Sequence, residues 1–183
     1  MTTSAVPISA ALLRQPIQPS DRPQEQAFRG LVRTLGLLER VMQPHFARFG
    51  ISASQWGVLR SLHRAEAEGL QGLRITDLSE RLLIRPPSVT GVLDRLERDG
   101  LVTRDAATDD LRAKCVRLTV RGHRLVQQVL RVHGEQIDRV LAGLKPHDCG
   151  ELGRLTAQLC IHLEGLLQPS TLESAEPRKK TEE

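Results

Sequence analysis

The chain has 183 residues, of which 39% are hydrophobic and 26% are charged, with a net charge of +4. This balance is typical of one globular domain, and no apolar run approaches the ~20 residues that a membrane-spanning helix requires. Three cysteines without a Cys-x-x-Cys pair argue against a disulfide framework and a structural zinc site, and the scarcity of aromatic residues argues against base stacking on single strands.

The first 22 residues are rich in small residues and proline and show no sustained periodicity, so we expect residues 1–22 to form a flexible arm. Because no basic segment precedes their weakly apolar stretch, we expect no secretory signal. The sequence therefore predicts a cytoplasmic protein with no membrane partner.

From residue 23 onward, apolar residues recur at spacings of three and four, which predicts a helix over about 23–49. Gly50 is placed to end this helix in a left-handed conformation. Ser52 and Gln55 have the spacing of a capping box, which predicts the start of a second helix running through Leu62.

A short extended element at 73–75 precedes a third helix, which we expect Thr76 to cap and which runs through Leu83. The proline pair that begins at Pro86 suits the first turn of a fourth helix. Backbone N–H groups in the first turn have no partner within the helix, so the N–H group that proline lacks is not missed there. Gly100 is expected to end that helix. The two short helices and their tight turn form a helix-turn-helix pattern.

Residues 101–105 and 114–118 read as two strands of a hairpin around a polar tip. Thr119 is expected to cap a long helix, and Pro146 to begin the last one. The segment 169–183 is polar, and we expect it to be a disordered tail.

The order of these elements predicts a mainly α fold with a small β-wing, over residues 23–168. In this winged helix-turn-helix, the DNA-binding lobe covers about 52–118, and dimerisation helices cover about 23–49 and 119–168. The first helix and the last two carry more apolar surface than one small lobe can cover. A two-fold homodimer would bury that surface and place two recognition helices about one DNA turn apart.

The positive charge is concentrated in one quarter of the chain. Residues 81–124 contain ten Lys and Arg but six Asp and Glu, so the whole excess lies there. This distribution is expected if the segment faces phosphates, and the alternative is an ordinary solvated surface.

The run from Leu78 to Gly122 resembles the MarR family of transcriptional regulators. The family's recognition-helix pattern is matched by PPSVTGVLDRLERDGLV at 86–102, and its wing signature, Asp-x-Arg-x-x-x-Val-x-Leu-Thr-x-x-Gly, by residues 110–122. The resemblance covers roughly residues 24–168. It implies a homodimeric regulator, by family default a repressor, that binds double-stranded DNA at a pseudo-palindromic operator and needs no cofactor.

By this resemblance, Arg112 enters the minor groove at the wing tip and Asp110 holds it by an ion pair. The fourth helix enters the major groove, Arg95 contacts a phosphate, and Thr76 can donate to the backbone. The alternatives are a merely solvated Asp110–Arg112 pair and ordinary polar surface residues on the helix. The residues expected to contact DNA are Thr76, Pro86, Ser88, Thr90, Gly91, Arg95, Asp110, Arg112 and Lys114.

Members of the family often bind small aromatic or phenolic acids in a crevice between the dimer helices and the DNA-binding lobe. By resemblance, the residues expected to line that crevice here are His45, Trp56, Arg60 and His63. The alternative is that the tryptophan belongs to the core and that the histidines are surface or capping groups.

Four rival functions are less consistent with the sequence: a thiol sensor, a winged helix used only for protein contacts, an enzyme and a metal sensor. A thiol sensor would have to use Cys115, which we expect to be a strand residue without a redox role. A protein that uses its winged helix only for protein contacts would not need the basic excess. We expect no enzyme, because the sequence lacks motifs of common enzyme classes such as GxSxG, the P-loop and HExxH. We also expect no metal site, because the remaining candidates are too loosely arranged: His147, Cys149, Cys160 and His162.

Overall fold

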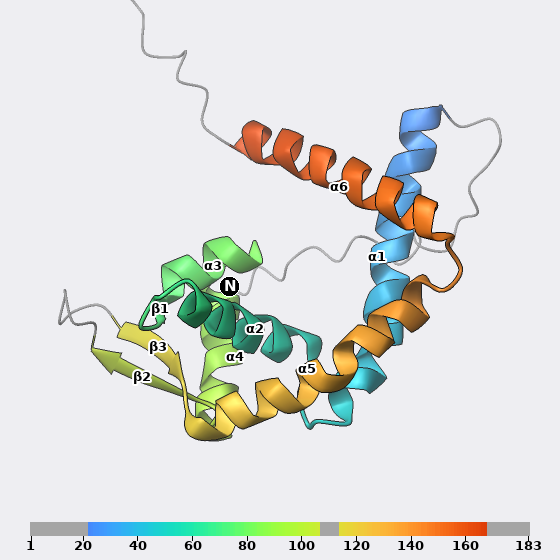
Figure 1. Cartoon of the computed structure of the whole chain (residues 1–183). Coiled ribbons are helices and arrows are strands. Elements are labelled where there is room, and N and C mark those ends of the chain that lie inside the picture. Colours follow the sequence, from blue (N-terminus) through green and yellow to red (C-terminus); the bar gives the residue numbers. More distant parts are fainter. Residues whose placement is uncertain (1–21, 107–113, 168–183) are drawn as a thin grey trace, which may run out of the picture. The chain divides into compact units, whose positions relative to one another are not determined.

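The structure, a computed structural model, describes residues 22–106 and 114–167. Its elements follow the expected order (Figure 1), and the mainly α fold with a small β-wing is confirmed. A three-stranded antiparallel sheet has the order β1-β3-β2. The elements are α1 (Pro23–Ala47), α2 (Ala53–Ala67), β1 (Leu73–Arg74), α3 (Ile75–Leu82), α4 (Pro86–Arg98), β2 (Val102–Ala106), β3 (Lys114–Leu118), α5 (Val120–Leu141) and α6 (Pro146–Leu167).

The cap of α2 is the one that the sequence predicts, whereas α1 ends slightly before the expected position, at Ala47 with Arg48 as its C-cap residue. Gly50 follows α1 with φ +72°, a left-handed conformation that glycine adopts without a Cβ penalty. At the start of α2, the Gln55 N–H donates to Ser52 Oγ at 3.2 Å, and the Ser52 N–H donates to Gln55 Oε1 at 2.9 Å. This reciprocal pair satisfies two N–H groups that have no partner inside the helix.

The prediction that Thr76 caps α3 is wrong. The helix begins at Ile75, and Arg74 is its N-cap residue. The Arg74 N–H donates to Asp77 Oδ2 at 2.9 Å, so the carboxylate three residues ahead satisfies the free backbone group. Thr76 therefore lies inside the first turn of the helix and not at its cap.

The core is built from the end of α1, from α2, α3, α4, the sheet and the first half of α5, and from the loops at Ile51 and Leu101. Its members are apolar, and burying each large one contributes roughly 1.5–3 kcal/mol. They are Phe46, Ile51, Trp56, Val58, Leu59, Leu62, Ala65, Leu73, Leu78, Val89, Leu93, Leu96, Leu101, Val102, Val116, Leu118, Val126 and Val129. The helix that matches the recognition-helix pattern is thus held by a core of its own lobe.

Gly122 fixes how α5 leaves the wing. A Cβ at this position would lie 2.1 Å from the Leu101 carbonyl oxygen, which no real side chain tolerates. The same oxygen accepts the Thr119 N–H at 3.1 Å, and Thr119 Oγ1 accepts the Gly122 N–H at 2.9 Å. The last residue of the wing signature is therefore glycine because the first turn of α5 contacts the backbone that leads into β2.

The chain divides into two compact units between Val140 and Leu141, and α6 belongs to the second. Ile161 and Leu166 on α6 are exposed, as are Phe28 and Leu35 on α1 in the first unit. Across the two described stretches, no helix combines the length and the hydropathy needed to cross a membrane.

Candidate nucleic-acid interface

One face of α4 is buried and the other is open. Val89, Leu93 and Leu96 are completely buried against the core. The opposite side carries the predicted contact residues: the exposed Pro86, Ser88, Gly91 and Arg95 and the half-buried Thr90. These polar residues leave one side of α4 accessible to a partner.

Two features of α4 suit a close approach to DNA. Pro86 occupies the first turn, where its missing N–H has no helical partner. A Cβ added at Gly91 would meet nothing within 4 Å, so packing within the chain does not require glycine there. The Thr90 hydroxyl donates to the Pro86 carbonyl at 3.0 Å and retains its capacity to accept a hydrogen bond.

The turn between α3 and α4 is fixed by local contacts. Leu83 has φ +53°, an uncommon left-handed conformation for a residue with a branched side chain. The Ser79 hydroxyl donates to the Ile84 carbonyl, and the Ile84 N–H donates back to the Ser79 carbonyl at 3.1 Å. These bonds hold the reversal that directs α4 away from α3.

Arg104 joins the wing to α4, a link that the sequence did not reveal. Its Nη2 donates to Asp94 Oδ1 at 2.6 Å and to the Thr90 carbonyl at 3.4 Å, and its Nε lies 3.5 Å from Glu97 Oε2. The Arg104 side chain is only 13% exposed. A charged side chain thus holds β2 beside α4. In the sequence, the acidic Asp94 within the matched helix pattern was the residue that could have indicated a basic partner.

The wing tip lies outside the described residues, and with it both Asp110 and Arg112. Lys114 begins β3 and pairs with Ala106 of β2. The structure therefore describes the root of the wing, from Val102 to Ala106 and from Lys114 to Leu118.

The basic excess is partly neutralised within the chain. Arg81 forms an ion pair with Glu68 at 2.6 Å, and Arg104 is paired as described above. Arg95, at the exposed side of α4, has no ion pair with any other described residue.

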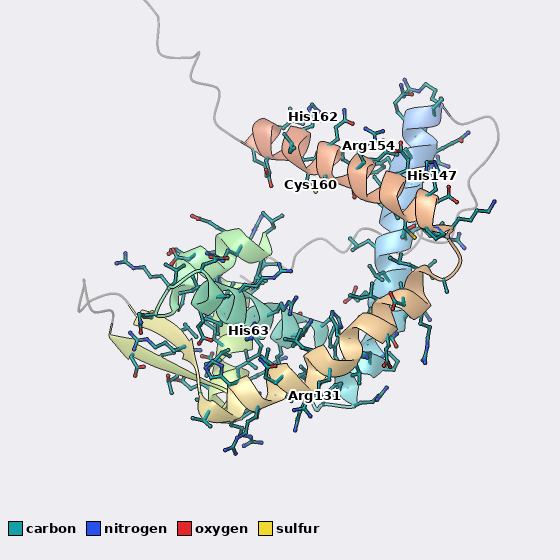
Figure 2. The ribbon with its side chains drawn as sticks, viewed as in Figure 1. His63, Arg131, His147, Arg154, Cys160 and His162 are labelled. Atoms are coloured by element: carbon teal, nitrogen blue, oxygen red, sulfur yellow. The ribbon has the colours of Figure 1, made fainter. Side chains whose placement is uncertain are left out.

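The candidates for ligand contact lie on both sides of a helix junction. His45 and Trp56 are buried, and the guanidinium of Arg60 lies 6.0 Å from the centroid of the Trp56 ring. His63, labelled on α2 in Figure 2, contacts α5 through its Nε2, 3.3 Å from the Gln127 amide nitrogen.

His133 of α5 completes this cluster, and the sequence did not single it out. Its Nδ1 lies 3.4 Å from His45 Nε2, and its ring centroid lies 5.3 Å from that of Trp56. Burial lowers the pKa of His45, and the charge of Arg48 lowers it further. Burial, then the charges of His45 and Arg60, lower the pKa of His133. Both shifts favour the neutral form of each ring, in which one nitrogen donates and the other accepts, so one ring can donate to the other.

The cysteines and histidines outside this cluster are dispersed. Cys115 is buried in β3, next to the position that a Cβ on Gly72 would occupy. Within the described part of the chain, no three His, Cys, Asp or Glu side chains are grouped to hold a metal ion. The four weighed as metal ligands, three of them labelled in Figure 2, all lie on α6: His147, Cys149, Cys160 and His162.

Sequence comparison identifies relatives that are named as transcriptional regulators. The family model described as "MarR family" matches residues 51–114. An HTH-type transcriptional regulator of Bacillus subtilis, YkoM, is 30% identical over 118 residues, which are 64% of this chain and 73% of that protein. The HTH-type transcriptional regulator FarR of Neisseria gonorrhoeae is 31% identical over 109 residues, 60% of this chain and 68% of FarR.

Solved structures share the fold. A point mutant of E. coli MarR, complexed with operator DNA, superposes with a TM-score of 0.68 at 23% identity, covering 76% of this chain and 99% of that one. A probable transcriptional regulator from Pseudomonas aeruginosa gives a TM-score of 0.65 at 24% identity, covering 75% and 99%. The matched architecture extends well beyond an isolated helix-turn-helix.

Proposed function

The chain belongs to the MarR family, and from this membership we propose that it is a transcriptional repressor that binds operator DNA as a homodimer. We further propose that a small aromatic or phenolic ligand releases it from the DNA. The chain is a regulator and not an enzyme, in keeping with relatives that are named as HTH-type transcriptional regulators. Because a repressor must bind chromosomal DNA, we expect the protein to be located in the cytoplasm.

The observation that carries the proposal is the polar open face of α4. A helix fits the major groove, which is ~12 Å wide, and small polar side chains there reach base edges. Ser88 and Thr90 supply such groups, Gly91 leaves room for the backbone to approach, and Arg95 supplies a cation for a phosphate. The structure of E. coli MarR with operator DNA has the same fold.

The wing supplies the second contact in this proposal. Arg104 couples β2 to α4, so the root of the wing is held beside the recognition helix. Arg112, steadied by Asp110, reads a narrow minor groove, whose negative potential attracts a guanidinium. Lys114 and Thr76 add backbone contacts.

Exposed apolar side chains support the homodimer. Phe28 is 62% exposed and Leu35 is 63% exposed on α1, and α6 presents Ile161 and Leu166. These apolar faces are candidates for an interface, and a second copy related by two-fold symmetry would cover the same faces on both chains. Light scattering at micromolar concentration should give about twice the 20.4 kDa chain mass, and a folded monomer would contradict the proposal.

The inducer site is proposed at the junction of α1, α2 and α5, lined by His45, Trp56, Arg60 and His63. Arg60 supplies a cation for a carboxylate, and the aromatic rings supply stacking surface. Because His45 and Trp56 are buried, entry requires the junction to open, and that opening would change the spacing of the recognition helices. Coupling of this kind weakens DNA binding roughly 5–150-fold.

The wing test uses fluorescence anisotropy with a labelled operator duplex. Arg112→Ala should weaken binding by ~1–3 kcal/mol and flatten the preference for A·T pairs beside the half-sites. Asp110→Ala should cost less, and the double variant should match Arg112→Ala alone, because the two side chains act in one contact. Wild-type affinity and preference in Arg112→Ala would refute the wing contact.

A further inference from the structure

A cavity of about 730 Å³ is lined by residues of the α1–α2 loop, the end of α4 and the first turns of α5. This volume lies within the usual range of small-molecule sites, ~300–1,000 Å³. All of these elements belong to the first unit of the chain. The lining consists of Phe49, Gly50, Ile51, Arg98, Asp99, Leu101, Arg121, Arg124, Leu125 and Gln128.

One part of the lining is apolar. Ile51 and Leu101 are buried core residues, and Phe49 and Leu125 are half-buried. A ligand with an aromatic ring or an alkyl chain would remove the remaining apolar surface of Phe49 and Leu125 from water.

The other part of the lining is cationic. It contains Arg98, Arg121 and Arg124, and the only acidic group among the lining residues is Asp99. Among the described residues, none of the three arginines has an ion pair or a hydrogen bond to a side chain, unlike Arg81 and Arg104. The cavity thus carries a net positive charge that the described chain does not neutralise.

We propose that this cavity binds a small organic anion, a carboxylate with an apolar body, at a site separate from the inducer crevice. The carboxylate accepts charge-assisted hydrogen bonds from Arg121 and Arg124 of α5, and Arg98 of α4 adds a third cation. The apolar body lies on Phe49 and Leu125.

The cavity is separate from the crevice but touches the same aromatic cluster. None of the crevice residues lines the cavity. Phe49, however, contacts His45 with ring centroids 5.8 Å apart. An occupant therefore contacts the end of α4 directly and the α1–α5 junction through one ring.

The binding step does not depend on the proposed DNA function, so it is tested first without DNA. Isothermal titration of the full chain with decanoate should show saturable binding, with butyrate and the uncharged decanol each about tenfold weaker or more, because each lacks one of the two complementary parts. A carboxylate that binds no more tightly than decanol would overturn the proposal, as would no decanoate binding up to its solubility limit.

The arginines are tested with a matched control on the same helix. Arg121→Gln combined with Arg124→Gln should weaken decanoate binding about tenfold or more, because two charge-assisted contacts are lost. Arg131→Gln should bind like the wild type, because Arg131, labelled on α5 in Figure 2, is exposed but does not line the cavity. Equal loss in both variants would indicate general attraction and overturn the site.

Two further outcomes would assign a different role to these arginines. Decanoate binding that survives the double substitution but is lost in Arg60→Gln would place the anion in the inducer crevice. Weaker duplex binding by the double variant, with no decanoate binding by the wild type, would make the arginines DNA-backbone contacts. Either result overturns the cavity proposal, whereas failure of duplex binding with intact decanoate binding would overturn only the proposed function.

Discussion

Replacing Gly122 by alanine should destabilise the protein, although alanine is the better helix former by about 1 kcal/mol. The new methyl group would lie 2.1 Å from the Leu101 carbonyl oxygen and 3.3 Å from Leu118 Cδ2. Relieving that overlap requires a backbone shift, for which overpacking typically costs about 1–3 kcal/mol. The shift also stretches the bond from the Thr119 N–H to the same oxygen, worth about 0.5–1.5 kcal/mol. After the helix-propensity gain is subtracted, the net loss is about 0.5–3.5 kcal/mol.

Gly134→Ala is the matched control, because it makes the same substitution in the same helix. A Cβ at Gly134 meets nothing within 4 Å, so alanine should raise the free energy of unfolding by about 0.5–1 kcal/mol. Urea unfolding followed by circular dichroism, at one fixed protein concentration, measures both changes. A Gly122→Ala protein as stable as the wild type would refute the claim that close contact with Leu101 requires glycine.

Two further predictions concern the wing root and the histidine pair. Arg104→Met should lower the free energy of unfolding by about 1–2 kcal/mol. A double-mutant cycle with Asp94→Asn should give a coupling energy of about 1 kcal/mol or less, because the Asp94 side chain is 60% exposed. Strictly additive losses would show that the ion pair contributes nothing to stability. Because the pKa values of His45 and His133 are lowered in the folded state, the unfolded chain binds more protons, so stability should fall as the pH drops below about 6.5. In urea unfolding at pH 7 and pH 5, His133→Gln should lose less stability than the wild type over that interval, and an equal loss would contradict the role of the pair.

Features that depend on near neighbours were predictable from the sequence. The capping box of Ser52 and Gln55, the left-handed Gly50 after α1 and the proline start of α4 each involve residues no more than a few positions apart. At α3 the expected cap was wrong, because Thr76 is a short polar residue near the boundary and resembles an N-cap. The hydrogen bond from the Arg74 N–H to the Asp77 carboxylate instead places the cap at Arg74.

Features that join distant segments were not predictable in this way. His133 is 88 positions from His45, and no periodicity indicates that their rings meet. The Arg104–Asp94 pair depends on how β2 packs on α4, and the cavity depends on the α1–α2 loop meeting α5. Each requires the packed core, which brings these segments together.

Selection of duplexes from a randomised pool, followed by titration at two salt concentrations, tests most directly whether α4 reads DNA. The wild type should select a pseudo-palindromic site with half-sites about one helical turn apart. Thr90→Ala should change the preferred bases inside each half-site, because the proposal places Thr90 against base edges. Arg95→Ala should weaken all sequences alike and lower the salt slope by about one, because the proposal places Arg95 against a phosphate. No selected sequence in the wild type, or wild-type behaviour in both variants, would contradict the assignment of α4 as the recognition helix.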